Sequence, residues 1–294
     1  MRPLVSVGIP AYNRPGLLEH AARSVLDQTV HNLEVIISDD ASPDDEVSRV
    51  GERLAAADPR VRFIRQSRNL GHDRNFQQVL ELAEGRYFMW LSDDDRLDPM
   101  YVAHCLAVLE SDPSVAIAWG RARYYRDGAH VIDERTMNLQ ARRPGLRVIA
   151  YFASVNVNGP LFGLMRRREL LAAGGFPEVP AGDWLLVARM AARGRVLTLP
   201  EVHIHRSMAG LGSREEELAR SFGLSGGWAR HHHFWVARHL LGALPVPPPA
   251  AALSSLLVLL RFPGVALLRR AGLAGLEPYV AEWLRARDLR GSRA

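Results

Sequence analysis

Short apolar runs alternate with longer amphipathic segments over residues 1–91 of the chain. The runs are rich in β-branched or aromatic residues, which predicts strands at 4–9, 33–38, 61–65 and 87–91. Apolar residues recur at helical spacing between them, which predicts helices that begin at Pro15 and near residues 45–57 and 73–84. Strands that alternate with helices of this length form right-handed βαβ units, so we expect an α/β fold with a mostly parallel sheet and helices on both faces.

The pattern is less regular beyond residue 115. We expect strands at 115–119, 161–165 and 196–199, and a helix that begins at Gly182. From about Ser213 the sequence reads as helical and then becomes rich in proline. We therefore predict an α/β domain over 1–213 and a helical, Arg-rich extension over 214–294.

The composition is typical of a folded domain, with 23% charged and 48% hydrophobic residues. The basic extension lacks a nucleic-acid-binding motif, so we expect no nucleic-acid partner and favour anionic lipid or an acidic protein. Prolines at 245–249 interrupt its longest uncharged stretch, which argues against a membrane-spanning helix. Residues 250–260 either lie in the lipid interface or pack on the α/β domain.

The compartment is expected to be the cytoplasm. Cys105 is the single cysteine, so no internal disulfide can form, and the N-terminus lacks a basic region followed by a long apolar run. Because the C-terminal extension is basic, a peripheral position on the inner face of the membrane is a second expectation.

Polar clusters follow three of the predicted strands. Residues 12–14 (YNR) come after the first strand, Asp39 and Asp40 after the second, and residues 93–95 (DDD) after the fourth. Ligands of doubly wound sheets bind at the carboxyl ends of the strands. The three clusters are therefore expected to converge on one crevice.

Three consecutive aspartates at a strand end repel one another unless a cation neutralises them. Mg²⁺ and Mn²⁺ prefer oxygen ligands and commonly share them with substrate phosphates, so one interpretation is a metal held by Asp94 with help from Asp93 or Asp95. The alternative is a solvated turn before a helix at Pro99, with Asp98 as its N-cap.

The pair Asp39 and Asp40 also has two interpretations. One carboxylate could accept an N–H hydrogen of a nucleotide base, and the other, most simply Asp39, could cap the loop that it begins.

Taken together, the motifs resemble family-2 glycosyltransferases in order and spacing. They are VSVGIPAYN at 5–13, SVLDQT at 24–29, EVIISDDAS at 34–42, EGRY at 84–87 and SDDD at 92–95, and the likeness extends over about 4–210. The resemblance implies a GT-A fold, a nucleoside-diphosphate sugar as donor, a hydroxyl acceptor of unknown identity, inversion at the anomeric carbon, and Mn²⁺ or Mg²⁺ as cofactor.

The resemblance also implies roles for individual residues. Residues that bind the nucleotide, in part as the lining of the base and ribose pocket, are expected to be Pro10, Ala11, Tyr12, Arg14, Asp40, Asn69, Arg74 and Asp93. Asp94 is the expected principal metal ligand, with Asp95 and His205 as further candidates. Arg74 has a second interpretation as a surface arginine at a helix start, and His205 as a structural loop histidine.

The catalytic base is implied by a second pair of motifs, GGFP at 174–177 and AGDW at 181–184, where Asp183 would take the proton of the acceptor hydroxyl. Gly182 departs from the family, since many relatives have Glu there. Without the other motifs, Asp183 would read as a plain helix N-cap.

Aromatic and histidine residues complete the candidates. Trp119, Trp184 and Phe162 could line the acceptor site, although core packing is the default for such side chains. The histidines at 231–233 are expected to be surface residues, because neighbours on a helix point in different directions.

Three rival functions predict different sequence features. A processive polysaccharide synthase should add membrane-spanning helices and a QxxRW motif after the catalytic aspartate, and a nucleotidyltransferase should carry a glycine-rich N-terminal loop; the chain shows neither. A non-catalytic nucleotide-sugar-binding or scaffolding protein that retains the fold is the remaining alternative, and the presence of Asp40, Asp94 and Asp183 argues against it.

Overall fold

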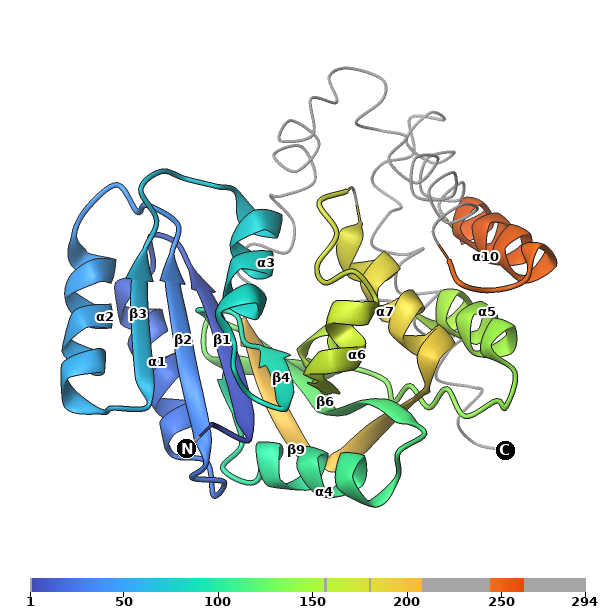
Figure 1. Ribbon diagram of the computed structural model, residues 1–294, viewed down its shortest axis with the longest axis horizontal. Coiled ribbons are helices and arrows are strands. Elements are labelled where there is room, and N and C mark those ends of the chain that lie inside the picture. The colour runs from blue at the N-terminus through green and yellow to red at the C-terminus, as the bar shows by residue number, and fades with distance from the viewer. Residues whose placement is uncertain (1, 156–157, 180, 208–243, 262–294) are drawn as a thin grey trace.

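A computed structural model describes residues 2–155, 158–179, 181–207 and 244–261 (Figure 1). Its strands are β1 (Val5–Ala11), β2 (Leu33–Asp39), β3 (Val61–Arg65), β4 (Tyr87–Trp90), β5 (Arg96–Leu97), β6 (Val115–Arg126), β7 (Ala129–Asp133), β8 (Leu164–Arg166) and β9 (Arg195–Ser207). Its helices are α1 (Pro15–Leu26), α2 (Glu46–Ala57), α3 (His72–Leu82), α4 (Tyr101–Ser111), α5 (Pro144–Ser154), α6 (Arg167–Ala172), α7 (Gly182–Arg193) and α10 (Pro248–Arg261), with a 3₁₀ turn at Gly159–Phe162.

The strands form one mixed sheet in the order β3-β2-β1-β4-β8-β6-β9-β5, and β7 extends it as a hairpin partner of β6. Strands β3, β2, β1 and β4 are mutually parallel. Strand β8 is antiparallel to both β4 and β6, and β9 is parallel to β6. The carboxyl ends of β1, β2, β4, β6 and β9 therefore lie at one edge of the sheet, and the predicted mostly parallel sheet is confirmed.

Helices cover both faces of the sheet (Figure 1). On β1 the residues alternate between the two faces, and helix α3 lies against the face to which Gly8 belongs. A Cβ atom at Gly8 would lie 2.6 Å from Cγ2 of Val79 on α3, so only glycine allows this close approach. The start of α3 is thereby held near the carboxyl ends of β1 and β2.

Several elements differ from the sequence prediction. Strand β6 continues beyond the predicted end at 119 to Arg126. Half-exposed Arg121 and Arg123 alternate there with buried Ala122 and Tyr124, which is the pattern of a strand with one solvent-exposed face. The predicted strand at 161–165 is correct only in its second half, as β8 begins at Leu164. Residues 161 and 162 belong to the 3₁₀ turn that starts at the Gly159-Pro160 pair, which favours a turn.

Asp98 is not the N-cap of the following helix. Helix α4 begins at Tyr101, and the carboxylate of Asp98 instead accepts hydrogen bonds from residues of β9. The alternative of a plain solvated turn ahead of this helix is therefore wrong.

Helix α10 is the part of the C-terminal extension that the structure describes. It packs against α5 (Figure 1). A Cβ atom built on Gly145 of α5 would lie 2.9 Å from Cβ of Ala250. The predicted boundary at 213 and the histidines at 231–233 lie outside the described residues. Within those ranges no helix has both the length and the apolar character needed to cross a membrane.

Candidate active site

Two of the three consecutive aspartates join the loop after β4 to the loop after β1. Oδ2 of Asp93 accepts the backbone N–H of Tyr12 at 3.1 Å, and its Oδ1 lies 3.0 Å from Nη1 of Arg14. The same Nη1 lies 2.9 Å from Oδ2 of Asp94. Two carboxylates of one loop thus converge on one cationic nitrogen, at the strand edge where the sequence places the site.

The electrostatics of this pair favour a bound cation. Burial raises the pKa of Asp93 to about 6, although the Arg14 guanidinium and the Tyr12 N–H oppose this effect. The neighbouring charge of Asp94 raises the pKa of Asp93 further. A second cation beside Arg14 would stabilise both carboxylates in their ionised form. A cation of higher charge that displaced Arg14 would have the same effect.

Asp95 points to a different partner. Its side chain is 1% exposed, and Oδ2 lies 2.8 Å from Nε of Arg206 on β9. The Arg206 guanidinium lies over the ring of Phe162, with 4.0 Å between its carbon and the ring centroid, and near the ring of Tyr124. Asp95 is therefore neutralised within the protein, which contradicts its predicted role as a metal ligand.

The two aspartates after β2 have separate tasks. Asp39 is fully buried and accepts the backbone N–H and the hydroxyl of Ser42, so it caps the loop as the alternative interpretation expected. The Asp40 carboxylate accepts the backbone N–H groups of Leu70 at 2.6 Å and Gly71 at 3.0 Å. Asp40 therefore holds the loop before α3, and each of its oxygens retains one lone pair for a ligand.

The loop before α3 places Asn69 and Arg74 differently. Oδ1 of Asn69 accepts the N–H of Gly71 and stabilises the turn beside Asp40. Arg74 is exposed and lies 3.4 Å from Glu81 and 3.5 Å from Glu178, so its surroundings are those of a surface arginine. The structure brings Asn69 to the site and leaves Arg74 beside it, paired with glutamates.

Asp183 lies in the first turn of α7 and is only partly exposed. Its Oδ2 accepts a hydrogen bond from Nδ2 of Asn158 at 3.0 Å. Burial raises the pKa of Asp183, and the hydrogen bond from Asn158 opposes that rise. A partly exposed carboxylate of raised pKa is suited to accept a proton.

The turn before Asp183 explains the departure at Gly182. A Cβ atom at this position would lie 2.2 Å from the carbonyl oxygen of Pro177. The preceding residue, Ala181, has a left-handed backbone with φ of 55°. The turn is therefore tight enough to exclude a side chain at 182, while Asp183 keeps its place.

His72 connects the nucleotide half of the site with Asp183. Burial raises the pKa of both Asp40 and Asp183, and the charge of His72 at the start of α3 acts to lower both. In addition, Gln77 of α3 accepts the backbone N–H of Phe176, in the turn that leads to α7, at 2.8 Å. Helix α3 thus contacts the turn that leads to Asp183, and the loop before it is held by Asp40.

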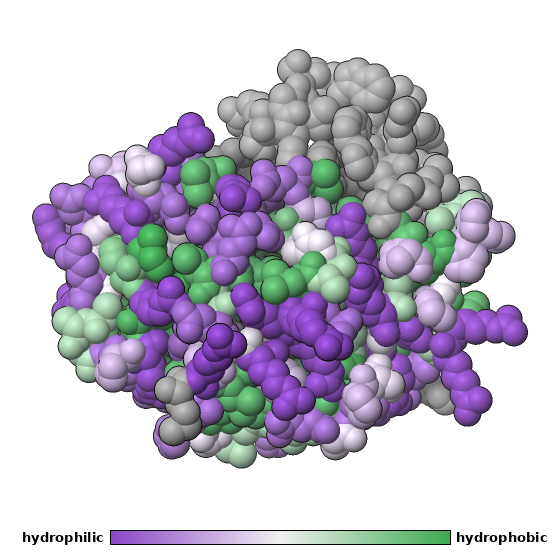
Figure 2. Space-filling model, viewed as in Figure 1, coloured by the Kyte–Doolittle hydropathy of each residue, from purple (hydrophilic) through white to green (hydrophobic). Residues whose placement is uncertain are grey.

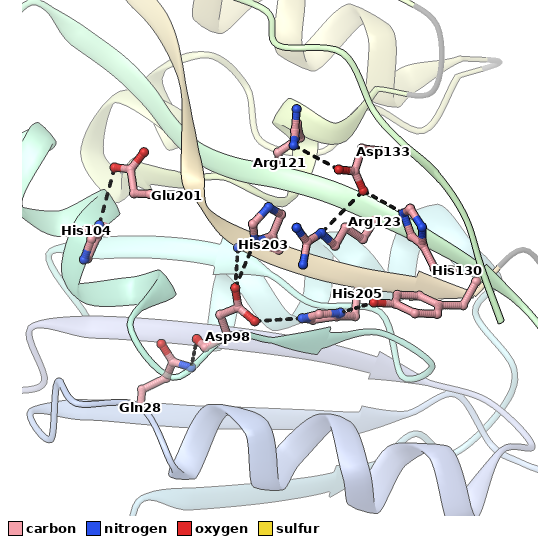
Figure 3. A network of polar contacts seen from close by, with 11 residues as sticks. Gln28, Asp98, His104, Arg121, Arg123, His130, Asp133, Glu201, His203 and His205 are labelled. Carbon is pink, nitrogen blue, oxygen red and sulfur yellow. Dashed lines mark hydrogen bonds and ion pairs between the residues drawn. The ribbon is translucent and has the colours of Figure 1, made fainter. Parts of the chain in front are cut away.

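His205 belongs to a network of polar contacts with Asp98 and neighbouring residues (Figure 3). Its Nε2 lies 2.7 Å from Asp98, and its Nδ1 lies 2.9 Å from the hydroxyl of Tyr125. His203 lies 3.1 Å from the same carboxylate. Both nitrogens of His205 are engaged, so the structure does not bring it to Asp94 and its surroundings are those of a structural histidine.

The predicted aromatic lining is only partly present. Trp119 is 0% exposed, so it belongs to the core and cannot contact an acceptor, which corrects that prediction. Phe162 is buried beneath Arg206. Trp184 is half-buried beside Asp183, and Tyr12 is 46% exposed at the end of β1, where Pro10 and Ala11 are buried in the sheet.

Two residues that the sequence analysis did not single out are central to the geometry. Arg206 follows Val202 and Ile204 at alternate positions of β9, and that period of two could have shown that it points inward. Asn158 precedes Gly159 and Pro160, a pattern that reads only as a turn. Its contact with Asp183 arises from tertiary packing alone.

The surface around these elements is mainly hydrophilic. On the face shown in Figure 2, hydrophobic residues form smaller groups between charged and polar ones. Among the residues that the structure describes, no three His, Cys, Asp or Glu side chains are arranged to hold a metal ion. Any cation at Asp93 and Asp94 would therefore need further ligands from substrate or water.

Comparisons with known proteins agree with this architecture. Residues 6–173 match the family described as glycosyl transferase family 2. The chain is 32% identical over 225 residues to Uncharacterized protein MT1568 of Mycobacterium tuberculosis, covering 71% of this chain and 68% of that protein. It is 40% identical over 117 residues to chondroitin synthase of Escherichia coli, covering 40% of this chain and only 17% of that longer enzyme.

Solved structures share the fold. The mannosyltransferase PcManGT of Pyrobaculum calidifontis aligns over 100% of this chain and 82% of its own length, with a TM-score of 0.60 and 20% identity. S. aureus TarS 1-349 aligns over 88% of this chain and 71% of its own, with a TM-score of 0.63 and 17% identity. Both likenesses show the fold predicted from the sequence, a GT-A fold. The arrangement of the strand-end carboxylates, the matched residues and this fold agree, and the chain belongs to glycosyl transferase family 2.

Proposed function

We propose that this chain transfers a sugar from a nucleoside-diphosphate sugar to an acceptor hydroxyl with inversion, in a reaction that depends on Mn²⁺ or Mg²⁺. The observation that carries the proposal is the convergence of Asp93 and Asp94 on the Arg14 guanidinium, beside Tyr12 at the carboxyl end of β1. Asp183, in the first turn of α7, is the proposed base. Two structural neighbours support the donor class, since they were solved with UDP-GlcNAc and with GDP-Man and Mn²⁺.

The nucleotide would lie along the ends of β1 and β2. The exposed ring of Tyr12 offers a stacking surface for a base, and the remaining lone pairs of Asp40 can accept a base N–H. The loop held by Asp40 closes this end of the site. Asn69, which shapes that loop, completes the proposed nucleotide pocket.

The donor set fits a hard divalent cation. Asp93 and Asp94 present carboxylate oxygens to one point, and such cations take one or two carboxylates together with substrate phosphates. When bound, the metal supplies positive charge that stabilises the departing diphosphate. Nη1 of Arg14 now pairs with both carboxylates. When a metal replaces it there, the Arg14 guanidinium can turn to a phosphate oxygen.

The acceptor half depends on Asp183. In a one-step displacement the acceptor oxygen attacks the anomeric carbon, its proton passes to the carboxylate of Asp183, and the diphosphate leaves from the opposite face. A raised pKa makes Asp183 a stronger base, while the Asn158 hydrogen bond keeps a share of it ionised. A non-catalytic binding protein would have no use for such a base. The cytoplasmic location and the lipid contact of the extension stay predictions.

A thermal-shift screen tests the proposal. We expect UDP- or GDP-sugars to raise the Tm of the full chain in the presence of Mn²⁺, because a ligand that binds only the folded state stabilises it. At a concentration 100 times the Kd, the expected stabilisation is about 2.7 kcal/mol. No shift with UDP-, GDP- or dTDP-sugars, with or without metal, would contradict the proposal.

A further inference from the structure

Asn158 connects a buried tyrosine to Asp183. The hydroxyl of Tyr151 on α5 donates to Oδ1 of Asn158 at 2.7 Å, and Nδ2 of Asn158 donates to Oδ2 of Asp183 at 3.0 Å. Asn158 is 1% exposed. The three side chains come from α5, the turn at 158–162 and α7, so the chain of hydrogen bonds joins three separate elements.

The backbone of Asn158 holds its side chain in place. Its φ of 62° and ψ of 39° lie in the left-handed region, which asparagine tolerates better than most residues. Its carbonyl accepts the N–H of Leu161, and the next N–H, of Gly159, donates to the buried carboxylate of Glu134 at 3.0 Å. Two backbone hydrogen bonds therefore anchor the turn that carries the amide.

The carboxylate of Asp183 determines which way the amide faces, and Tyr151 stabilises that orientation. An ionised carboxylate can only accept, so it requires Nδ2 of Asn158 on its side, whereas the tyrosine hydroxyl can donate or accept and here donates to Oδ1. A flipped amide would direct its oxygen at the Asp183 carboxylate and its NH₂ group at the tyrosine oxygen. The observed orientation directs a donor at Asp183, and the tyrosine hydroxyl stabilises it.

We propose that Asn158, whose orientation Tyr151 stabilises, is a positioning residue that directs Asp183 toward the acceptor and stabilises its ionised form. The inference rests on the proposed role of Asp183 as the base. Asn158 itself contacts neither the donor nor the reacting atoms. It donates a hydrogen bond to Oδ2 of Asp183. The other carboxylate oxygen, Oδ1, then accepts the proton of the acceptor hydroxyl.

The charges around Asp183 give the expected direction of the effect. Burial raises its pKa, and the hydrogen bonds from Asn158 and from the backbone N–H of Trp184 lower it. The charge of His72 also lowers it, and that of Asp73 raises it. Arg147 of α5 bonds to carbonyls at the opposite end of α7. Loss of the Asn158 donor leaves burial less opposed, so the pKa of Asp183 should rise and the base should be protonated at a higher pH.

Three substitutions separate the donor from the backbone. Asn158→Gly removes the amide and tolerates a left-handed backbone, Asn158→Asp keeps the side-chain shape but replaces the donor with a charge, and Tyr151→Phe removes only the hydroxyl. Asp127→Gly is the matched control, since Asp127 is also left-handed, with φ of 51°, but lies in the exposed β6–β7 turn.

The first readout needs no substrate. In the full chain labelled with ¹³C at the aspartate carboxyl carbon, the resonance lost in Asp183→Asn identifies Asp183, and its pH titration is then followed in each variant. We expect the midpoint to move to higher pH in Asn158→Gly, further in Asn158→Asp, and in the same direction in Tyr151→Phe. An unchanged midpoint in the two Asn158 variants would overturn the inference.

The second readout is hydrolysis of UDP-GlcNAc or GDP-mannose in the presence of Mn²⁺, followed by nucleotide release. At neutral pH we expect Asn158→Gly to lose about tenfold in kcat, in line with one hydrogen bond to a charged group, and to recover part of the loss at higher pH. An equal loss at every pH would indicate a merely structural role and overturn the inference. Full hydrolysis in Asp183→Asn would instead refute the proposed base, whatever the titration shows.

Discussion

Asp183→Asn is expected to lower the rate of sugar transfer by about 10²–10⁴-fold, which is the usual contribution of a general base. Asparagine keeps the shape of the side chain and its place at the start of α7, but it cannot take the acceptor proton. Donor binding should be nearly unchanged, because the carboxylates proposed to hold the diphosphate, Asp93 and Asp94, lie in the loop after β4. Transfer kinetics with the donor found in the thermal-shift screen, together with its Kd, measure both parts.

Asp73→Asn provides the matched control for this substitution. Asp73 also carries a carboxylate whose charge acts on Asp183, yet it pairs with His72 at 2.8 Å rather than with the Asn158 amide. Its loss should change the rate far less than the loss of Asp183. Turnover of Asp183→Asn within a few-fold of the natural chain would exclude Asp183 as the base.

Arg206→Met is expected to destabilise the fold by about 3–5 kcal/mol at neutral pH, because it leaves the carboxylate of Asp95 buried without a partner. The destabilisation should shrink in mildly acidic solution. Burial already raises the pKa of Asp95 to about 6 with Arg206 in place, and without the arginine this carboxyl should take up a proton at still higher pH. Urea unfolding at neutral and acidic pH measures the difference.

The double variant Arg206→Met with Asp95→Asn separates charge from packing. It removes both members of the pair, so most of the lost stability should return, whereas the contact of the guanidinium with Phe162 stays lost. If Arg206→Met alone is as stable as the natural chain at neutral pH, Arg206 does not neutralise Asp95. Asp95 would then be available again as a metal ligand.

The sequence was informative wherever a residue's position follows from its place along a strand. Tyr12, Asp40 and Asp93 directly follow parallel neighbours β1, β2 and β4, so their proximity follows from the βαβ pattern alone. The predicted bounds of β1 to β4 also agree with the structure within two residues. Strands β1, β2 and β4 are buried on both faces, so each reads as a nearly continuous apolar run in the sequence.

The sequence was uninformative where side chains from distant elements compete for the same partner. The run at 93–95 gives no sign that Asp95 alone turns to Arg206, because that choice depends on the register of β9 against β6. The sequence likewise leaves His205 open as a ligand or a structural histidine, and in the structure its Nε2 pairs with Asp98. For Trp119 the sequence left an acceptor role open beside the default of core packing, because the turn at 158–162 that packs on its ring is distant in sequence.

The most direct test of the central claim is a calorimetric titration of UDP and GDP into the full chain and into Asp94→Asn, each with Mn²⁺ and with chelator. The convergence of Asp93 and Asp94 predicts that one nucleotide binds the natural chain at least about tenfold more tightly with Mn²⁺, and that Asp94→Asn loses this gain. Equal affinity in all four conditions, or no binding of either nucleotide, would contradict a metal-bridged diphosphate at the end of β4.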